Sequence, residues 1–158
     1  YILGMLFYRF ISENITNYIN ALQIEAGIEG FDYAAMPDDE AEQGREMIVQ
    51  EKGFFIAPSD LFCNMLKEGD NPDLNQLLDD VFHRIESSAK GTASEDDLKG
   101  LFDDIDVNSN KLGPTVAKRN DSLRKIMTKI ASLDLRSEFP GHSIDLFGDA
   151  YELYLIKI

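Results

Sequence analysis

The chain has 158 residues, 44% hydrophobic and 28% charged, a balance that excludes a globally disordered polypeptide and allows one buried core. Its 29 acidic and 15 basic residues give a net charge of −14, which opposes general attraction to nucleic acid or to an anionic membrane surface. A single cysteine excludes an internal disulfide, and with only two distant histidines the composition also excludes a structural zinc site.

The N-terminal segment predicts a long amphipathic helix. Apolar residues recur at spacings of three and four from Leu3 to Leu22, which places them on one helical face. The most apolar part, residues 1–10, is interrupted by Arg9 and is about half of the roughly 20 residues that a membrane span requires, so we expect no membrane contact. Because the chain begins with Tyr1 rather than Met, we interpret it as a piece of a longer polypeptide.

Six further segments contain helix start residues or apolar stripes. They predict helices at 38–46, 59–67, 71–85, 94–105, 114–130 and 143–154. The clearest of these helices is 71–85, in which Asn71-Pro72 gives an N-cap followed by proline at the first helical position and an unbroken apolar stripe follows. Ser94 and Asp97 resemble a capping box at the start of a later helix.

A short apolar run separates two of these helices. Residues 53–57 are bounded by glycine and proline and are too few for a helix, so we expect an extended or strand-like piece, for which 31–34 is a candidate pairing segment. Seven helices without a set of alternating strands predict an all-α fold. The expected architecture is a compact bundle over 1–158, a single domain with at most this short two-stranded β piece.

Candidate chemical sites are few. The stretch from Asp104 to Asn110 alternates oxygen-bearing side chains as a calcium-binding loop does, but it lacks the required glycine and final glutamate, which favours a solvated loop with Asx turns. Cys63 is interpreted as a small core residue, and His83 and His142 have no regularly spaced partners. We therefore assign no catalytic, cofactor-binding or metal-binding residue. An independent enzyme would require a pocket of converging titratable groups, which the sequence does not locate.

One segment departs from the acidic balance of the chain. Between residues 111 and 129, one acid, Asp121, stands against six basic residues: Lys111, Lys118, Arg119, Arg124, Lys125 and Lys129. At about 100° per residue, the three lysines at 118, 125 and 129 form one stripe turned away from the apolar helix face. Such a stripe can contact a phosphate backbone, complement an acidic partner surface, or remain a solvated face that pairs with neighbouring acids. The six residues are candidate contacts for DNA phosphates or for a protein partner.

Six longer segments of the sequence, in this order along the chain, resemble a known protein family. They are FYRFISEN at 7–14, EKGFFI at 51–56, KGLFDD at 99–104, DVNSNKLG at 106–113, VAKRN at 116–120 and FGDAYE at 147–152. Together they resemble the N-terminal helical domain of the modification (M) subunit of type I restriction-modification systems. The resemblance implies a bacterial, cytoplasmic DNA methyltransferase subunit that transfers a methyl group from S-adenosylmethionine to N6 of adenine. The implied partners are a specificity subunit, a second M subunit, a restriction subunit and double-stranded DNA.

The sequence lacks the two motifs with which this family binds the methyl donor and transfers the methyl group. Asn71-Pro72 continues with Asp73 rather than as an Asn/Asp-Pro-Pro-Phe/Tyr motif, and no Phe-x-Gly-x-Gly cofactor loop occurs. The resemblance therefore implies that this chain is not catalytic by itself and binds no cofactor, and that S-adenosylmethionine binds to a following domain of the parent subunit. The implied role is to close M subunits around DNA and to support subunit assembly. The alternative is a purely protein-binding domain that contacts the specificity subunit or the second M subunit without touching DNA.

Overall fold

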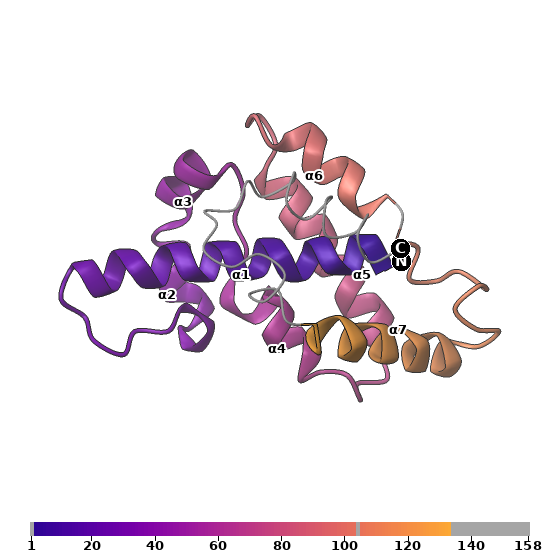
Figure 1. Ribbon diagram of the computed structural model, residues 1–158. Coiled ribbons are helices and arrows are strands. Elements are labelled where there is room, and N and C mark those ends of the chain that lie inside the picture. The colour runs from indigo at the N-terminus through magenta and orange to yellow at the C-terminus, as the bar shows by residue number, and fades with distance from the viewer. Residues whose placement is uncertain (1, 104, 134–158) are drawn as a thin grey trace.

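The computed structural model describes residues 2–103 and 105–133, and these ranges are entirely helical and irregular (Figure 1). Seven α-helices and two 3-10 helices follow one another as α1 (Ile2–Glu25), η1 (Tyr33–Ala35), α2 (Asp38–Glu42), α3 (Arg45–Lys52), η2 (Pro58–Asp60), α4 (Phe62–Leu66), α5 (Leu74–Ser88), α6 (Glu95–Phe102) and α7 (Val116–Ala131). The predicted all-α fold is confirmed over these residues. Among the described helices, none combines the length and apolarity needed to cross a bilayer.

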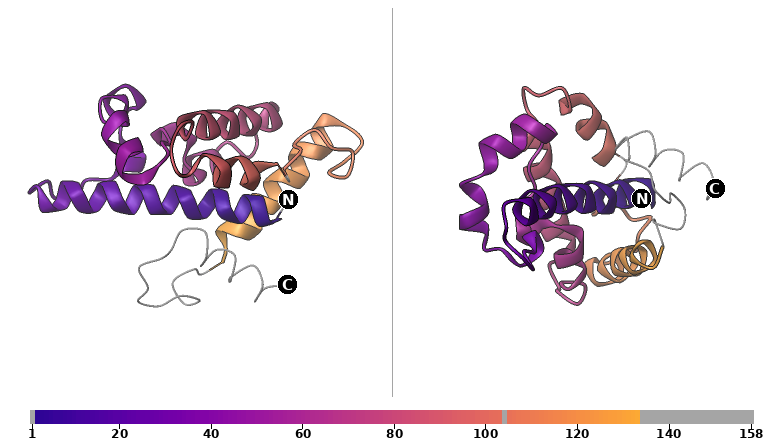
Figure 2. Two further views of the ribbon diagram at one scale, coloured as in Figure 1. Left: turned by 90° about the horizontal axis from the view of Figure 1, so that it is seen from above. Right: turned by 60° about the vertical axis from the view of Figure 1, so that its left-hand side comes forward.

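The long helix α1 runs the length of the bundle, and α4, α6 and α7 pack against it (Figure 2). Five successive residues, Gly4 to Tyr8, are buried, so this part of α1 is covered on nearly every side rather than along one stripe. A Cβ added at Gly4 would lie 2.5 Å from the side chain of Ile105, which indicates how closely the segment after α6 approaches α1. The sequence predicted one buried face, but in the first half of α1 the burial extends over most of the circumference of the helix.

The C-terminal end of α1 projects beyond its neighbours (Figures 1 and 2). It ends in a Schellman motif, in which Gly27 has a φ of 91° and its N–H donates to Ile24 O at 3.0 Å. The N–H of Ile28 donates to Gln23 O, also at 3.0 Å. Glycine tolerates this left-handed conformation without steric cost, so the helix has a well-defined end.

Aromatic side chains join the helices of the core. The ring of Tyr8 meets Phe62 and Phe82 edge to face at centroid distances of 5.5 and 5.3 Å, and Phe82 stacks on Phe102 at 4.6 Å. The hydroxyl of Tyr8 donates to the backbone oxygen of Asp60. The four rings connect α1, α4, α5 and α6, and the hydrogen bond links α1 to η2.

The expected two-stranded β piece is wrong for the described residues. Residues 33–35 form a 3-10 turn because Asp32 Oδ1 accepts from the N–H of Ala34. Gly53 ends α3 in the left-handed conformation, and residues 54–57 after it form neither helix nor strand. Side chains rather than a second strand satisfy the backbone here: Tyr33 Oη donates to Ile56 O at 2.7 Å. Ser88 Oγ accepts from the N–H of Phe55 at 2.9 Å and donates to its oxygen at 3.1 Å.

Several predicted helix boundaries also differ from the structure. The segment 38–46 contains two helices, because α2 ends before Gly44 and α3 begins after it. Helix α4 starts only at Phe62, since 58–60 is a 3-10 turn, and α5 starts at Leu74, because Asn71 Oδ1 accepts from the N–H of Asp73 in an Asx turn. Ser94 precedes α6 but its side chain forms no capping hydrogen bond. The helix predicted at 143–154 lies outside the described residues.

Candidate nucleic-acid interface

Helix α7, which contains most of the basic segment, lies against α1, α4 and α5 (Figure 1). Its inner face consists of Leu123, Met127 and Ile130, all buried. The buried side chain of Asn120 accepts from the N–H of Asn75 at 2.9 Å and donates to a backbone oxygen of the loop before α5. At its start, Thr115 accepts from the N–H of Lys118, so α7 has the side-chain N-cap that its sequence permits. The inner face therefore fixes the rotation of the helix about its own axis.

A single arginine from α1 secures the other end of α7. Arg9 Nη1 donates to Ile130 O at 2.5 Å and to Leu133 O at 2.7 Å, and Arg9 Nε pairs with Glu13 at 2.9 Å. The terminal carbonyl groups of a helix bear a partial negative charge, so a guanidinium is a favourable partner for them. Arg9 therefore joins the central helix to the last turn of α7.

The outer face of α7 presents the predicted lysine stripe to solvent. Lys118, Lys125 and Lys129 are all exposed, and they lie on the side of the helix opposite the buried residues. Lys111, in the loop before α7, is exposed as well. We call these four lysines together with Arg119 and Arg124 the α7 basic face.

Half of the α7 basic face already has a partner within the protein. Lys125 Nζ lies 2.9 Å from Asp121 Oδ2, and Arg124 pairs with the other oxygen of the same carboxylate. Arg119 donates to Gly113 O at 2.9 Å and to Asn110 at 2.5 Å. In the described part of the chain, the remaining lysines, Lys111, Lys118 and Lys129, form no ion pair.

Hydrogen bonds from Lys125 and then Arg124 lower the pKa of Asp121 below its ordinary value, so this carboxylate is charged at neutral pH. Sequence reasoning noted Asp121 as the one acid of the segment but assigned it no effect on the stripe. Its spacings of three and four residues from Arg124 and Lys125 are those at which helical side chains pair, and these spacings predict the two contacts.

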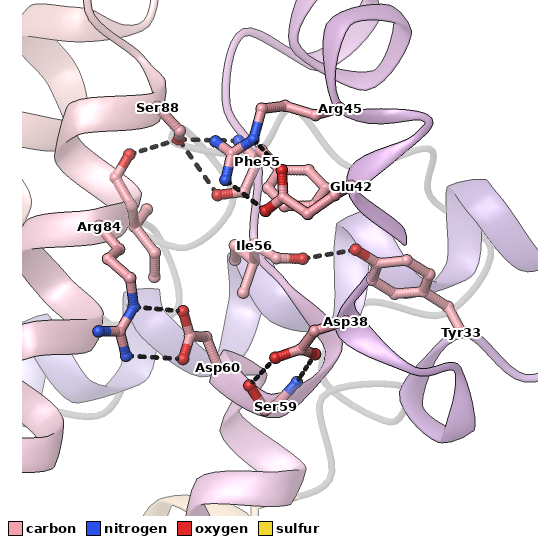
Figure 3. A network of polar contacts seen from close by, with 11 residues as sticks. Tyr33, Asp38, Glu42, Arg45, Phe55, Ile56, Ser59, Asp60, Arg84 and Ser88 are labelled. Atoms are coloured by element: carbon pink, nitrogen blue, oxygen red, sulfur yellow. Dashed lines mark hydrogen bonds and ion pairs between the residues drawn. The ribbon is translucent and has the colours of Figure 1, made fainter. Parts of the chain in front are cut away.

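A second polar region, which the sequence analysis missed, lies between α2, α3, η2 and α5 (Figure 3). This polar groove has a volume of about 330 Å³ and is lined by Asp38, Glu42, Arg45, Phe55, Ala57, Ser59, Asp60 and Arg84. Because its residues come from segments up to 46 positions apart, no local pattern in the sequence shows them together.

Four of the five charged side chains of the polar groove are paired with one another, and the fifth, Asp38, accepts hydrogen bonds from Ser59. Arg84 donates twice to Asp60, both at 2.9 Å, and Arg45 donates twice to Glu42, both at 2.7 Å. The hydrogen bonds from Arg45 lower the pKa of Glu42, and the Arg45 guanidinium also lies 4.3 Å from the ring centre of Phe55. These pairs join α2, α3, the 53–60 segment and α5, which favours a structural role for the groove over chemistry.

The comparisons with known proteins agree with this all-helical arrangement. A family model described as the HsdM N-terminal domain matches residues 1–130. The chain belongs to this family. It is 40% identical over 163 residues to the type I restriction enzyme MpnII methylase subunit of Mycoplasma pneumoniae, a match that covers 98% of the chain and 30% of that protein.

A solved structure is similar over the same range. The crystal structure of the type I restriction-modification system methyltransferase subunit from Streptococcus thermophilus matches with a TM-score of 0.68 and 30% identity, over 98% of this chain and 32% of that one. The HsdM N-terminal domain described here is thus the N-terminal domain of a type I restriction-modification methylase (M) subunit. The chain spans about a third of the length of these relatives.

The remaining candidate residues of this HsdM N-terminal domain are structural or exposed. In the loop before α7, Asp106 accepts from the N–H of Asn108 in an Asx turn, and Asn75 donates to Asn108, so the prediction of an Asx-turn loop is confirmed.

Cys63 is exposed, and its assignment to the core was wrong: the adjacent Phe62 points inward in its place. His83 contacts Asp79 of its own helix, and His142 lies outside the described residues. Over the described residues, no three His, Cys, Asp or Glu side chains are grouped closely enough for a metal.

Proposed function

We propose that this chain is the N-terminal DNA-clamp and assembly domain of a type I restriction-modification N6-adenine DNA methyltransferase subunit. In this proposal the domain helps to close M subunits around double-stranded DNA, and it assembles with a specificity subunit, a second M subunit and a restriction subunit in the bacterial cytoplasm. Residues 1–158 act as one helical domain, and the domain that transfers the methyl group lies elsewhere in the parent subunit. The relatives, which are about three times longer, support this division.

The observation that supports DNA contact is the α7 basic face. Two lysines of α7, Lys118 and Lys129, and Lys111 in the loop before it form no ion pair in the described ranges. The inner face and both ends of α7 are held by contacts with other residues, in a chain with a net charge of −14. A local cationic stripe on a strongly acidic protein confines contact with phosphates to that face. Such contacts are independent of base sequence, so target recognition is left to the specificity subunit.

The polar groove does not fit S-adenosylmethionine, which would supply the methyl group in the parent enzyme. The polar groove presents one aromatic ring, Phe55, and the Arg45 guanidinium already covers it, so no free aromatic face is left there for an adenine. Its carboxylates are paired with Arg45 and Arg84 or bonded to Ser59. The proposal therefore assigns this chain a part in binding and assembly only.

A protein-binding role without DNA contact is the second candidate. It is favoured by the projecting end of α1, where Ile24 and Ile28 are 55% and 48% exposed next to the Schellman motif. Exposed apolar side chains on a rigid element are typical of protein contacts. Under this alternative, changes on α7 or at this end weaken subunit assembly and leave the affinity of the assembled enzyme for DNA unchanged.

The test replaces Lys118, Lys125 and Lys129 by Gln in the full-length subunit, purified in its complex. Binding to a random-sequence duplex is measured over a range of salt concentrations. DNA affinity should fall, and the slope of log K against log salt should lose about two counterions, because Lys125 is already paired with Asp121.

The matched control removes three exposed lysines outside α7 and its preceding loop, Lys67, Lys90 and Lys99, and so makes the same change in net charge. It should leave the slope close to that of the unmodified complex. Sedimentation of both variants without DNA tests assembly. Weakened assembly of the α7 variant, with unchanged DNA affinity and slope, would favour the protein-binding alternative.

A further inference from the structure

Asp121 occupies an unusual place on the α7 basic face. It is the single acid between residues 111 and 129, and each of its two carboxylate oxygens contacts a different cation of that face. Lys125 Nζ lies 2.9 Å from Oδ2, and Arg124 Nη2 donates to Oδ1. One carboxylate therefore forms ion pairs with two of the six basic side chains of the α7 basic face.

The contacts of Asp121 serve no evident packing role. Its side chain is 43% exposed, it lies beyond the first turn of α7, and the N-cap of that helix is Thr115. Arg124 is placed independently of the ion pair, since a Cβ added at Gly69 would lie 3.1 Å from its side chain. Removal of the Asp121 charge should therefore leave the helix and the position of Arg124 largely unchanged.

We propose that Asp121 limits the affinity of the α7 basic face for DNA phosphates by holding Arg124 and Lys125 in ion pairs on the helix, an inference that rests on the proposed function. A phosphate can use these two cations only by displacing the carboxylate, and the carboxylate also repels the phosphate. Exposed ion pairs are weak, so Asp121 reduces binding without abolishing it. In the unmodified subunit Lys111, Lys118 and Lys129 then contact phosphates, while Arg124 and Lys125 stay in their ion pairs with Asp121.

The test is Asp121→Asn in the full-length subunit in its complex, which keeps the shape of the side chain and removes its charge. Affinity for a random-sequence duplex should rise about three- to tenfold at low salt, and the salt dependence should steepen by up to about two counterions. The control is Asp97→Asn, an exposed acid of α6 on another part of the surface, which changes the net charge equally. It should alter the affinity far less.

Two comparisons separate this inference from the proposed function. Lys125→Gln should have little effect on the slope in the unmodified subunit and a clear effect in the Asp121→Asn background. If the triple lysine variant lowers the slope while Asp121→Asn leaves it unchanged, weakens binding or matches Asp97→Asn, the inference about Asp121 is wrong and the DNA contact stands. If the triple lysine variant changes nothing, the proposed function itself fails. Far-UV circular dichroism of each variant checks that the fold is retained.

Discussion

Arg9 provides the sharpest test of how α7 is positioned, because one side chain joins the central helix to the end of the basic helix. Only 13% of its side chain is exposed, and its guanidinium donates to the carbonyl oxygens of Ile130 and Leu133 and pairs with Glu13. Arg9→Ala removes both hydrogen bonds and leaves the two carbonyl groups to water or without a partner. We expect the free energy of unfolding to fall by about 2–3 kcal/mol, since hydrogen bonds to charged groups contribute about 1.5–3 kcal/mol.

The assay is urea unfolding of the purified chain followed by far-UV circular dichroism, with the free energy taken from the midpoint and the m-value. Arg9→Lys keeps the charge but cannot reach both carbonyl groups with one planar group, so it should lose about half as much. Glu13→Gln removes only the exposed ion pair and should cost at most about 1 kcal/mol. An Arg9→Ala loss no larger than that of Glu13→Gln would refute the argument that Arg9 fastens the end of α7.

Three further predictions concern other contacts of the fold. Asp60→Ala removes the nearly buried partner of Arg84 and should lower the free energy of unfolding by about 1–3 kcal/mol in the same urea assay, whereas replacement of exposed Asp96 should cost less than about 0.5 kcal/mol. Gly4→Ala should destabilise the chain by about 1–2 kcal/mol although alanine favours helices, because its Cβ would lie 2.5 Å from Ile105; a stabilised variant would contradict this close approach. The hydrogen bond to the Asp79 carbonyl, and then the charge of Asp79, raise the pKa of His83, so its stabilising effect is complete below a pH of about 6.5 and is lost as the pH rises through the raised pKa. His83→Gln should flatten the stability profile in that range, as NMR titration and urea midpoints would show.

Local patterns were sufficient for most of the helices. The apolar stripe of residues 74–85 and the three–four spacing of α1 both follow from contacts within a few residues, which is why the sequence predicts them. Helix starts were less predictable. Asn71 and Ser94 are N-cap residues by type, but Asn71 forms an Asx turn before the helix and Ser94 forms no cap bond. Several local conformations compete for the same side-chain oxygen, and the sequence does not decide among them.

Contacts between distant segments could not be predicted. Arg9 reaches carbonyl groups 121 and 124 residues away, and Ser88 satisfies the backbone of Phe55 across 33 residues. The second contact bears on the failed β pairing, because the N–H of Phe55 already donates to a side chain of α5 and is not available to a second strand. The polar groove was missed for a similar reason: Glu42 and Arg45 are a local pair, but Arg84 reaches Asp60 across 24 residues, and only the fold brings the two pairs together.

The lysine stripe shows both the strength and the limit of reasoning from spacing. Its direction, away from the buried face of α7, follows from the helical period and is confirmed by the exposure of Lys118, Lys125 and Lys129. The available charge is smaller than the count of six cations indicates, because Asp121 and the loop before α7 engage three of them. Charge counts along a segment therefore overstate the number of phosphates that the segment can contact.

The salt dependence of DNA binding by the full-length subunit is the most direct measurement of whether the α7 basic face meets phosphates. With Lys118, Lys125 and Lys129 replaced by Gln, the account predicts weaker binding and a slope reduced by about two counterions, while the matched variant at Lys67, Lys90 and Lys99 keeps the original slope. Equal slopes for the unmodified subunit and the α7 variant would contradict it.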